Sequence, residues 1–336
     1  MSLFILFYIC ATYFTLSSEV YSQSTWLAMQ AAALYYMHGL SGKETADRLN
    51  ISTATISRLL TRARESGMIT FQIPSPFVEC LEASRLLLER YNLKEAIIIP
   101  SHEESSSKEM RQAVALEGAR YLQRTISDKD VIGVAWGRTM NHLIQVLNPC
   151  QKKDNTFVSM HGSIPHCQYN DVGSLVSRIS MALGGQRFCF DTDALMRSKE
   201  ELTRFLNMEE NQKSAFLLKR ISVSVSGVGS LYPELDSPLL NNNYLQQADI
   251  KALQAKGVYG DILLRFFDEN GEECETDLKD RTLSIDFDTY RNIQTKIVVA
   301  SGKQKAYTIR AVLRGELADV IILDYELAKQ VIKISD

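Results

Sequence analysis

The sequence predicts an α/β protein in which a small helical domain precedes a larger, doubly wound domain with a mostly parallel sheet. A length of 336 residues is enough for two domains, each with its own core. Apolar residues recur at helical spacing over residues 26–66, whereas beyond residue 93 short apolar runs alternate with helical patterns. Alternation of this kind is typical of a parallel sheet covered by helices on both faces.

Composition and charge limit the classes to which the chain can belong. Hydrophobic residues make up 45% and charged residues 23%, which is ordinary for a globular protein and excludes a disordered or fibrous one. The formal net charge of −3 provides no overall positive field for a nucleic acid. Any binding of DNA must therefore depend on a local group of basic residues.

The cysteines indicate free thiols rather than a disulfide framework or a metal centre. Six cysteines are spread along the chain without a C-x-x-C pair, namely Cys10, Cys80, Cys150, Cys167, Cys189 and Cys274. His161, His166 and Cys167 lie close together in the sequence, but a zinc site would need a fourth ligand. We therefore expect a reducing compartment, the cytoplasm, and neither a metal nor another cofactor.

Residues 1–22 form an apolar extension that we expect to lie outside the fold. Residues 1–16 carry no charge and the first basic residue is Lys43, so the positive region of a signal peptide is missing. The run is also shorter than the ~20 apolar residues of a membrane span. The interpretations are an extension from an upstream start codon, a membrane anchor and a signal peptide. We favour the first and expect no stable membrane association.

Three helices are predicted in the domain of residues 23–75. The first covers residues 26–38, where apolar side chains recur on one side. Ser41 and Glu44 match a capping box at the start of a short second helix. After a three-residue joint, Ser52 is a suitable N-cap for a third helix with a buried apolar stripe.

An alternating run at residues 68–73 follows the third helix and predicts a strand. Helix, short helix, tight turn, helix and strand are the order of a winged helix-turn-helix, a DNA-binding fold. The alternative is a helical packing module with no role in DNA binding. The exposed side of the third helix argues against that alternative.

Side chains suited to DNA lie along this third helix. Hydroxyl groups and one guanidinium stand at its N-terminal end, where such helices contact base edges, and they belong to Thr53, Thr55, Ser57 and Arg58. Arg62 and Arg64, further along, suit phosphate oxygens. Residues 40–66 hold five basic and three acidic side chains, a local excess of two positive charges. We expect these residues to bind a double-stranded operator.

Pro74 and Pro76 mark the end of this domain. An amphipathic helix is predicted within residues 76–92, which we interpret as a linker between the domains. Its apolar side could also pair with the same helix of a second copy, because helix-turn-helix proteins usually bind DNA as dimers. We therefore expect a homo-oligomer, a dimer or a tetramer.

The remaining residues, 93–336, are predicted to form the doubly wound domain. A long helix is predicted at residues 108–125, and strands are predicted at residues 95–100, 131–136, 156–160, 187–190, 221–226, 262–267, 296–300 and 320–323. In open parallel sheets, ligands bind beyond the carboxyl ends of the strands, where helix N-termini expose unpaired N–H groups. Candidate binding residues are therefore sought at the ends of these strands.

Several strand ends carry residues suited to a phosphate or to sugar hydroxyls. The candidates are Gly137, Arg138, Thr139, Gly162, Asp261 and Lys305. Arg138 and Lys305 can neutralise an anion, and the carboxylate of Asp261 can accept hydrogen bonds from hydroxyl groups. Ordinary turns and solvent-exposed side chains are the alternative interpretation of these positions.

The order of these motifs resembles a known family. Residues 26–73, especially GLSGKETADRLNISTATISRLLTRARESGMI, are similar to the DNA-binding domain of the SorC family of sugar-responsive, DeoR-like regulators. The second domain resembles the sugar-binding domain of that family through VIGVAWGRT, SGVGS, GDILLRFFDENG and VVASGKQKAYTIRAVLRGELADVIILD. The resemblance covers nearly everything from Trp26 onward and keeps the same order.

The resemblance implies a fold related to sugar-phosphate isomerases, an effector at the strand ends, and usually a tetramer built from dimers. On the matching positions, residues 137–139 and Lys305 would hold a phosphate or equivalent hydroxyls, and Asp261 would contact the sugar chain. The sequence departs from the family in its apolar N-terminus and at Ser301, where members often have glycine. The second departure crowds the expected anion loop.

Two functions follow from these observations. The first is a DNA-binding transcriptional regulator of a carbohydrate-utilisation operon, whose operator affinity a sugar or sugar phosphate controls. The alternative is a sugar-phosphate isomerase-like enzyme with an accessory DNA-binding domain. An acid/base pair is not evident, because Asp261 and Asp324 each have a ready structural role. We therefore favour a regulator without catalytic residues.

Overall fold

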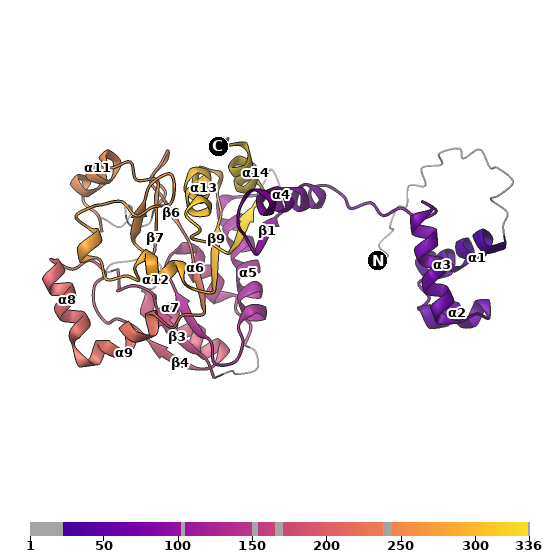
Figure 1. The fold of residues 1–336 in the computed structure, drawn as a ribbon, viewed down its shortest axis with the longest axis horizontal. Coiled ribbons are helices and arrows are strands. Elements are labelled where there is room, and N and C mark those ends of the chain that lie inside the picture. Colours follow the sequence, from indigo (N-terminus) through magenta and orange to yellow (C-terminus); the bar gives the residue numbers. More distant parts are fainter. Residues whose placement is uncertain are drawn as a thin grey trace. The chain divides into compact units, whose positions relative to one another are not determined.

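The computed structural model describes residues 23–101, 105–149, 154–164, 171–237, 239 and 244–334. The chain divides into two compact units, residues 1–73 and residues 74–336 (Figure 1). The apolar extension of residues 1–22 lies outside the described residues. Within the part that is described, no helix is long and apolar enough to cross a membrane.

The first unit contains the three expected helices. They are α1 Gln23–Ala32 with a π-helical continuation η2 Ala33–Met37, α2 Gly42–Leu49 and α3 Thr53–Glu65. The capping box of Ser41 and Glu44 is formed, and the Ser52 hydroxyl caps α3 through the backbone N–H of Thr55. A small core holds the helices together because each contributes fully buried side chains, among them Ala31, Ala46 and Ile56.

The expected strand at residues 68–73 is not formed, which corrects the prediction of a β-wing. A strand is stabilised by hydrogen bonds to a neighbouring strand, and the described residues of this unit contain none. Phe71 packs against Tyr36 but stays 67% exposed, so the alternating pattern does not bury a face. The first unit is a helix-turn-helix followed by an extended segment.

The second unit is built on the predicted parallel sheet. Its seven strands lie in the order β1-β10-β9-β5-β2-β3-β4, and all their pairings are parallel. They are β1 Glu95–Ile99, β2 Val131–Val134, β3 Thr156–Ser159, β4 Gln186–Phe188, β5 Val223–Ser226, β9 Thr295–Ala300 and β10 Val320–Asp324. The chain runs outward from β2 to β4 and returns through β5 on the other side of β2. This reversal is a topological switch point.

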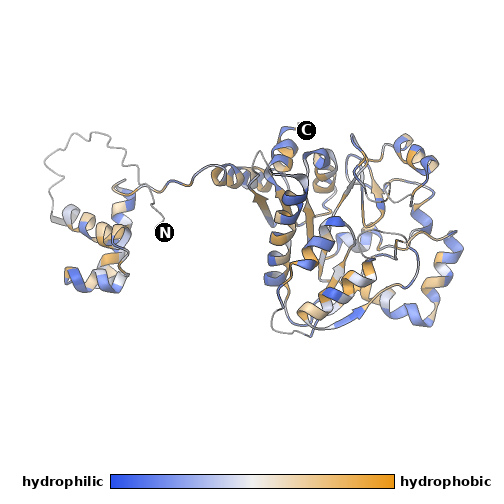
Figure 2. Cartoon of the chain, turned by 180° about the vertical axis from the view of Figure 1, so that it is seen from behind, coloured by the Kyte–Doolittle hydropathy of each residue, from blue (hydrophilic) through white to orange (hydrophobic). Residues whose placement is uncertain are grey.

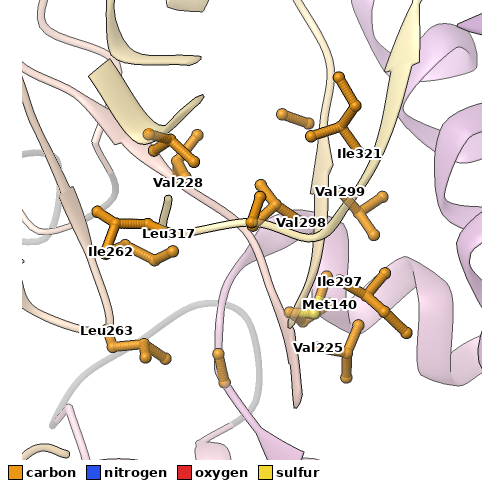
Figure 3. Packing of buried hydrophobic residues seen from close by; sticks show 14 of the residues in the cluster. Met140, Val225, Val228, Ile262, Leu263, Ile297, Val298, Val299, Leu317 and Ile321 are labelled. Carbon is orange, nitrogen blue, oxygen red and sulfur yellow. The ribbon is translucent and has the colours of Figure 1, made fainter. Parts of the chain in front are cut away.

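The central strands are buried on both faces because helices cover both. Every residue of β5 and β10 is buried. Figure 3 shows Val298 and Val299 of β9 pointing to opposite sides of the strand, where both pack among apolar side chains. In Figure 2 the strands in the middle of the sheet are hydrophobic, the edge strand β4 is hydrophilic, and the helices have a hydrophilic and a hydrophobic side.

Helices connect the strands and cover the sheet. They are α4 Phe77–Arg90, α5 Ser107–Thr125, α6 Arg138–Gln145, α7 Val172–Leu183, α8 Lys199–Asn207, α9 Glu209–Leu218, α11 Gln247–Ala255, α12 Phe287–Arg291, α13 Ala306–Arg314 and α14 Tyr325–Lys333, with the short 3-10 helices η3 Lys279–Arg281 and η4 Lys303–Lys305. Helix α4, interpreted from the sequence as a linker, packs on β1 and α14. Its buried side includes Leu87, so α4 belongs to the second unit.

The run of residues 262–267 is not a strand of the parallel sheet, which corrects a second prediction. It is part of a hairpin of β7 Gly260–Ile262 and β8 Arg265–Phe267, which pairs antiparallel with β6 Gly229–Ser230. Leu263 and Leu264 form the turn with φ angles of 56° and 65°. Turns of this kind favour glycine or asparagine, so two leucines carried no turn signal.

Candidate functional site

The outer side of α3 carries the residues expected to read DNA. Five of the six are exposed, namely Thr53, Ser57, Arg58, Arg62 and Arg64. Thr55 is half-buried, and its hydroxyl is 2.8 Å from the hydroxyl of Ser52. Thr55 therefore contributes to the cap of α3, a role that its place one turn into the helix explains.

The helical period of α3 separates its inner and outer sides. Ile56 and Ala63 are fully buried, whereas Arg58 lies on the opposite side of the helix. The guanidinium of Arg58 folds back toward the carbonyl oxygen of Ala54, with its Nε at 3.5 Å. A cationic side chain near the N-terminal end of an exposed helix can reach base edges in the major groove.

The second unit contains a cavity at the switch point of the sheet. It is a small pocket, with a free volume of about 50 Å³, and it is partly open to solvent. The residues that line it are Arg111, Ala135, Trp136, Gly137, Arg138, Thr139, Met140, Gly227, Val228, Gly229, Ser237, Asp261, Leu263 and Lys305. The segments that follow β2 and β5, neighbours in the sheet, contribute most of this lining through residues 135–140 and 227–229.

The loop after β2 brings the N-terminus of α6 to this cavity. Gly137 is the N-cap of α6, has a φ of 128° and offers no side-chain cap to the first N–H groups of the helix. A Cβ added at Gly137 would meet nothing within 4 Å, so the loop is open at this point. Helix N-termini with unpaired N–H groups attract anions, and the guanidinium of Arg138 reinforces this preference.

Lys305 enters the same cavity from η4. It is 7% exposed, and its Nζ donates a hydrogen bond of 2.7 Å to the carbonyl oxygen of Val228. Burial lowers the pKa of Lys305 to about 8, although the charge of Asp236 opposes this shift. A further negative charge in the cavity would therefore stabilise the protonated form of Lys305.

Asp261 on β7 provides an acidic group in the cavity. Its Oδ1 accepts a hydrogen bond of 2.9 Å from the hydroxyl of Ser237. Burial raises the pKa of Asp261 to about 6, while the hydrogen bond and the charge of Lys305 act in the opposite direction. Gly229 permits this packing, because a Cβ there would lie 2.1 Å from Oδ1 of Asp261.

Asp236 is a functional candidate that the sequence did not reveal. Its carboxylate lies beside the cavity and forms an ion pair with Arg138, and it accepts a hydrogen bond of 2.9 Å from Nε2 of Gln304. Nζ of Lys305 is 3.9 Å away. Burial acts to raise the pKa of Asp236, but Lys305, Arg138 and Gln304 together hold it below its usual value.

Neither Asp236 nor Arg111 follows a predicted strand, so neither could be identified as a candidate from the sequence. Asp236 lies in an irregular segment and Arg111 lies within the first two turns of α5. Both reach the site only through the tertiary fold. Residues 137–139 could be identified because they follow a predicted strand, whereas Asp236 and Arg111 do not.

Gly162 is not brought to the cavity, which corrects its selection as a candidate ligand residue. A Cβ at this position would lie 2.7 Å from the Cα of Ala194, so glycine is needed for close backbone packing. The neighbouring His161 is fully buried between the backbone N–H of Trp136 and the carbonyl oxygen of Gly162. Burial lowers the pKa of His161 to about 4, and the neutral imidazole has a packing role.

The candidate metal-ligating and catalytic side chains have structural surroundings. Across the described ranges, no group of three or more His, Cys, Asp or Glu side chains could hold a metal ion. Cys80, Cys189 and Cys274 are free thiols, while His166 and Cys167 lie outside those ranges. Asp324 accepts hydrogen bonds from the backbone N–H groups of Leu327 and Gly302, a structural role.

Comparison with protein families agrees with both units. Residues 75–333 match the family model described as "Putative sugar-binding domain", which begins just before α4. Residues 33–66 match the model of sigma-70, region 4, over the helix-turn-helix.

Relatives of known name extend over nearly the whole chain. The chain is 30% identical to the deoxyribonucleoside regulator of Bacillus subtilis over 317 residues, which cover 91% of this chain and 97% of the relative. It is 27% identical to the sorbitol operon regulator of Klebsiella pneumoniae, with 91% and 98% covered.

A solved structure supports the same relationship. The full-length sorbitol operon regulator SorC from Klebsiella pneumoniae matches with a TM-score of 0.72 and 26% identity, and the match covers 93% of this chain and all of the other. The names of these relatives are those of regulators, which sets aside the enzyme alternative. The chain belongs to the SorC family of sugar-binding transcriptional regulators.

Proposed function

We propose that α3 binds an operator and that a sugar or sugar phosphate bound in the cavity controls the affinity of the chain for that operator. The observation that carries this proposal is the cavity at the switch point, where Arg138, Lys305 and Asp261 converge. Two cations and a carboxylate on neighbouring loops suit a ligand that carries both an anionic group and hydroxyls.

The groups of the cavity divide between the two parts of such a ligand. An anionic group is held by Arg138, Lys305 and the N–H groups that follow Gly137, as at other helix N-termini. Hydroxyl groups donate hydrogen bonds to Asp261, which accepts a hydrogen bond from Ser237 at one of its carboxylate oxygens. A neutral sugar would accept hydrogen bonds from the same cations, but it would bind less tightly because it carries no charge to pair with them.

On the DNA side, the proposed roles follow the position of each side chain on α3. Thr53, Ser57 and Arg58 contact base edges, and Arg62 and Arg64 contact phosphates. A single helix with this small charge excess binds weakly, so two copies acting on two half-sites are part of the proposal. The operon-regulator name of the Klebsiella relative supports a carbohydrate operon as the target.

A thermal-shift screen of the full chain against sugars and sugar phosphates tests the ligand half. A ligand at ~100 times its Kd adds ~2.7 kcal/mol to the free energy of unfolding, so one chemical class should raise the Tm. Lys305→Met should remove the response to phosphorylated members. Flat melting curves across the panel, with wild type and variant alike, would contradict the proposal.

A further inference from the structure

The segment of residues 231–237 contacts the groups that the proposed ligand needs. It follows β6, and its backbone pairs with Ser230 at Asp236 through hydrogen bonds of 2.9 and 3.3 Å. At this end of the segment, the side chains of Asp236 and Ser237 turn toward the cavity residues. Their partners lie on three other elements, α6, η4 and β7.

The carboxylate of Asp236 is bound as an anionic ligand would be. One of its oxygens pairs with Arg138 at the start of α6, and the other accepts a hydrogen bond from Gln304 and lies near Lys305 on η4. The carboxylate therefore bridges two loops that meet at the strand ends. Guanidinium and ammonium groups hold carboxylates and phosphates by the same charge-assisted hydrogen bonds, so an anion and Asp236 need the same donors.

Ser237 makes the matching contact on the acidic side of the cavity. Its hydroxyl donates to Asp261 at 2.9 Å, and Ser237 is 1% exposed. A sugar hydroxyl that approaches Asp261 would seek the same carboxylate oxygen. Asp236 therefore binds the cationic groups of the cavity, and its neighbour Ser237 binds the acidic group.

Beyond these contacts the N-terminal end of the segment is anchored on Tyr259, whose carbonyl oxygen accepts hydrogen bonds from the N–H groups of Leu231 and Tyr232 and whose ring packs on that of Tyr232. The rest of the segment is more exposed. Leu231 is buried, but Tyr232 and Leu235 are 44% and 47% exposed. Little apolar area would be lost if the Asp236 end moved away, because much of the segment already faces solvent.

From these contacts we infer that Asp236 is an internal anion that competes with an anionic effector for Arg138 and Lys305, and that such an effector displaces it together with the Asp236 end of the segment of residues 231–237. The inference rests on the proposed function and deepens it by naming the contact that the effector breaks. Displacement converts ligand binding into a change of the backbone at the edge of the β6-β7-β8 sheet. The segment would thus have two conformations, and the ligand would shift the population toward the displaced one.

Binding of inorganic phosphate to the full chain tests the inference directly. Titration calorimetry of wild type and Asp236→Asn should show at least about tenfold tighter binding to the variant, because a charged competitor is removed. Asp280→Asn is the charge-matched control, since the side chain of Asp280 is 63% exposed and pairs with Lys199 at 3.2 Å. The control should bind phosphate as wild type does. In wild type, phosphate should also increase hydrogen exchange at residues 231–237.

Equal or weaker phosphate binding by Asp236→Asn, with an unchanged Tm, would overturn the inference. If the variant has a lower Tm, Asp236→Ser at a matched temperature below both transitions repeats the test. A sugar phosphate that binds wild type and Asp236→Asn equally would sink the internal anion alone and leave the proposed function standing. Phosphate and every sugar phosphate failing to bind either protein would sink both.

Discussion

Two ionisable side chains of the cavity have pKa values displaced toward each other. Burial lowers the pKa of Lys305 to about 8 and raises that of Asp261 to about 6. Between these values Lys305 is protonated and Asp261 is ionised, which is the state that binds an anion and accepts hydrogen bonds. Residue chemistry therefore sets a pH window for the effector.

Affinity for an anionic sugar should be greatest between about pH 6 and pH 8. A bound anion stabilises protonated Lys305, so affinity falls as the pH rises through about 8 and the free protein loses that proton. Hydroxyl donors stabilise ionised Asp261, so affinity falls as the pH drops through about 6. Titration calorimetry from pH 5 to pH 9 measures both limbs.

Single substitutions separate these two limbs. Lys305→Met should remove the fall on the alkaline side, and Asp261→Asn should reduce the fall on the acidic side. Protonation of the phosphate ester itself, with a pKa near ~6, accounts for any acidic limb that the second variant retains. An affinity independent of pH in wild type would contradict the assigned roles of both residues.

The arginines of α3 should differ in what they contribute to DNA binding. Arg58→Ala is expected to lower discrimination between operator and unrelated DNA by ~1–3 kcal/mol, because a guanidinium at a base edge reads sequence. Arg62→Ala should weaken both DNAs alike and reduce the salt dependence. Fluorescence anisotropy with both DNAs at two salt concentrations measures these effects.

Arg120→Ala provides the control for these variants, since Arg120 is an exposed arginine of the second unit with a side chain 63% exposed. It should leave both affinities unchanged. Equal losses from Arg58→Ala on operator and unrelated DNA would show that Arg58 contacts phosphate instead.

Residues next to strand ends could be found from the sequence, and the others could not. Arg138 and Lys305 were expected at one site because parallel strands end at one edge, and the structure does bring them to one cavity. Asp261, expected at the start of a strand, reaches the same cavity from the antiparallel hairpin of β7 and β8. Gly162 also follows a strand, but its neighbours fill the space with backbone. Asp236 arrives from an irregular segment, for which no periodicity or motif gives a position.

At the scale of elements, α4 illustrates how a helix can be predicted while its packing is not. The apolar spacing located the helix, but periodicity could not tell whether the apolar side meets the sheet or a second copy. In the structure Cys80, Ala83 and Leu87 are buried on β1 and α14. Phe77 and Leu81 remain 52% and 59% exposed, so α4 also has an outer apolar side.

Substitution of two leucines of α4 measures this packing. Leu87→Ala should lower the free energy of unfolding of the second unit by about 2–5 kcal/mol, because Leu87 is fully buried. Leu81→Ala, the matched control, keeps the outer side apolar and should cost less than about 0.5 kcal/mol. Urea unfolding followed by circular dichroism compares them. Equal effects would mean that α4 does not belong to the second unit.

The strand predictions were correct for the buried strands of the parallel sheet. They were wrong where strand formation depends on which neighbouring segment is available for pairing. The apolar runs of β9 and β10 fix their identity, because only a covered parallel strand is apolar on both faces. The run of residues 68–73 alternates equally well, but the described part of the first unit contains no neighbouring strand. The run of residues 262–267 folds into a hairpin through two leucines with positive φ, against their usual preference.

For the whole molecule, the central expectation is an assembly of two or four copies. Light scattering coupled to size-exclusion chromatography should give a mass that is a multiple of the 37.9 kDa chain. Val78→Asp places a charge on the outer side of α4, where Val78 is 47% exposed, and should lower that mass if the side pairs with a second copy. An unchanged mass would assign the interface to another surface, and a monomeric wild type would contradict the assembly itself.

Control of operator binding by the ligand joins the two units and is best tested by one titration. Operator DNA from beside the gene is titrated with full-length protein, with and without the sugar phosphate that raises its Tm. We expect the ligand to change the operator Kd by ~5–150-fold, the usual range of coupling between two sites, and Lys305→Met to abolish the change without altering operator affinity. An operator Kd that is the same with and without every ligand that binds the cavity would contradict control by a sugar.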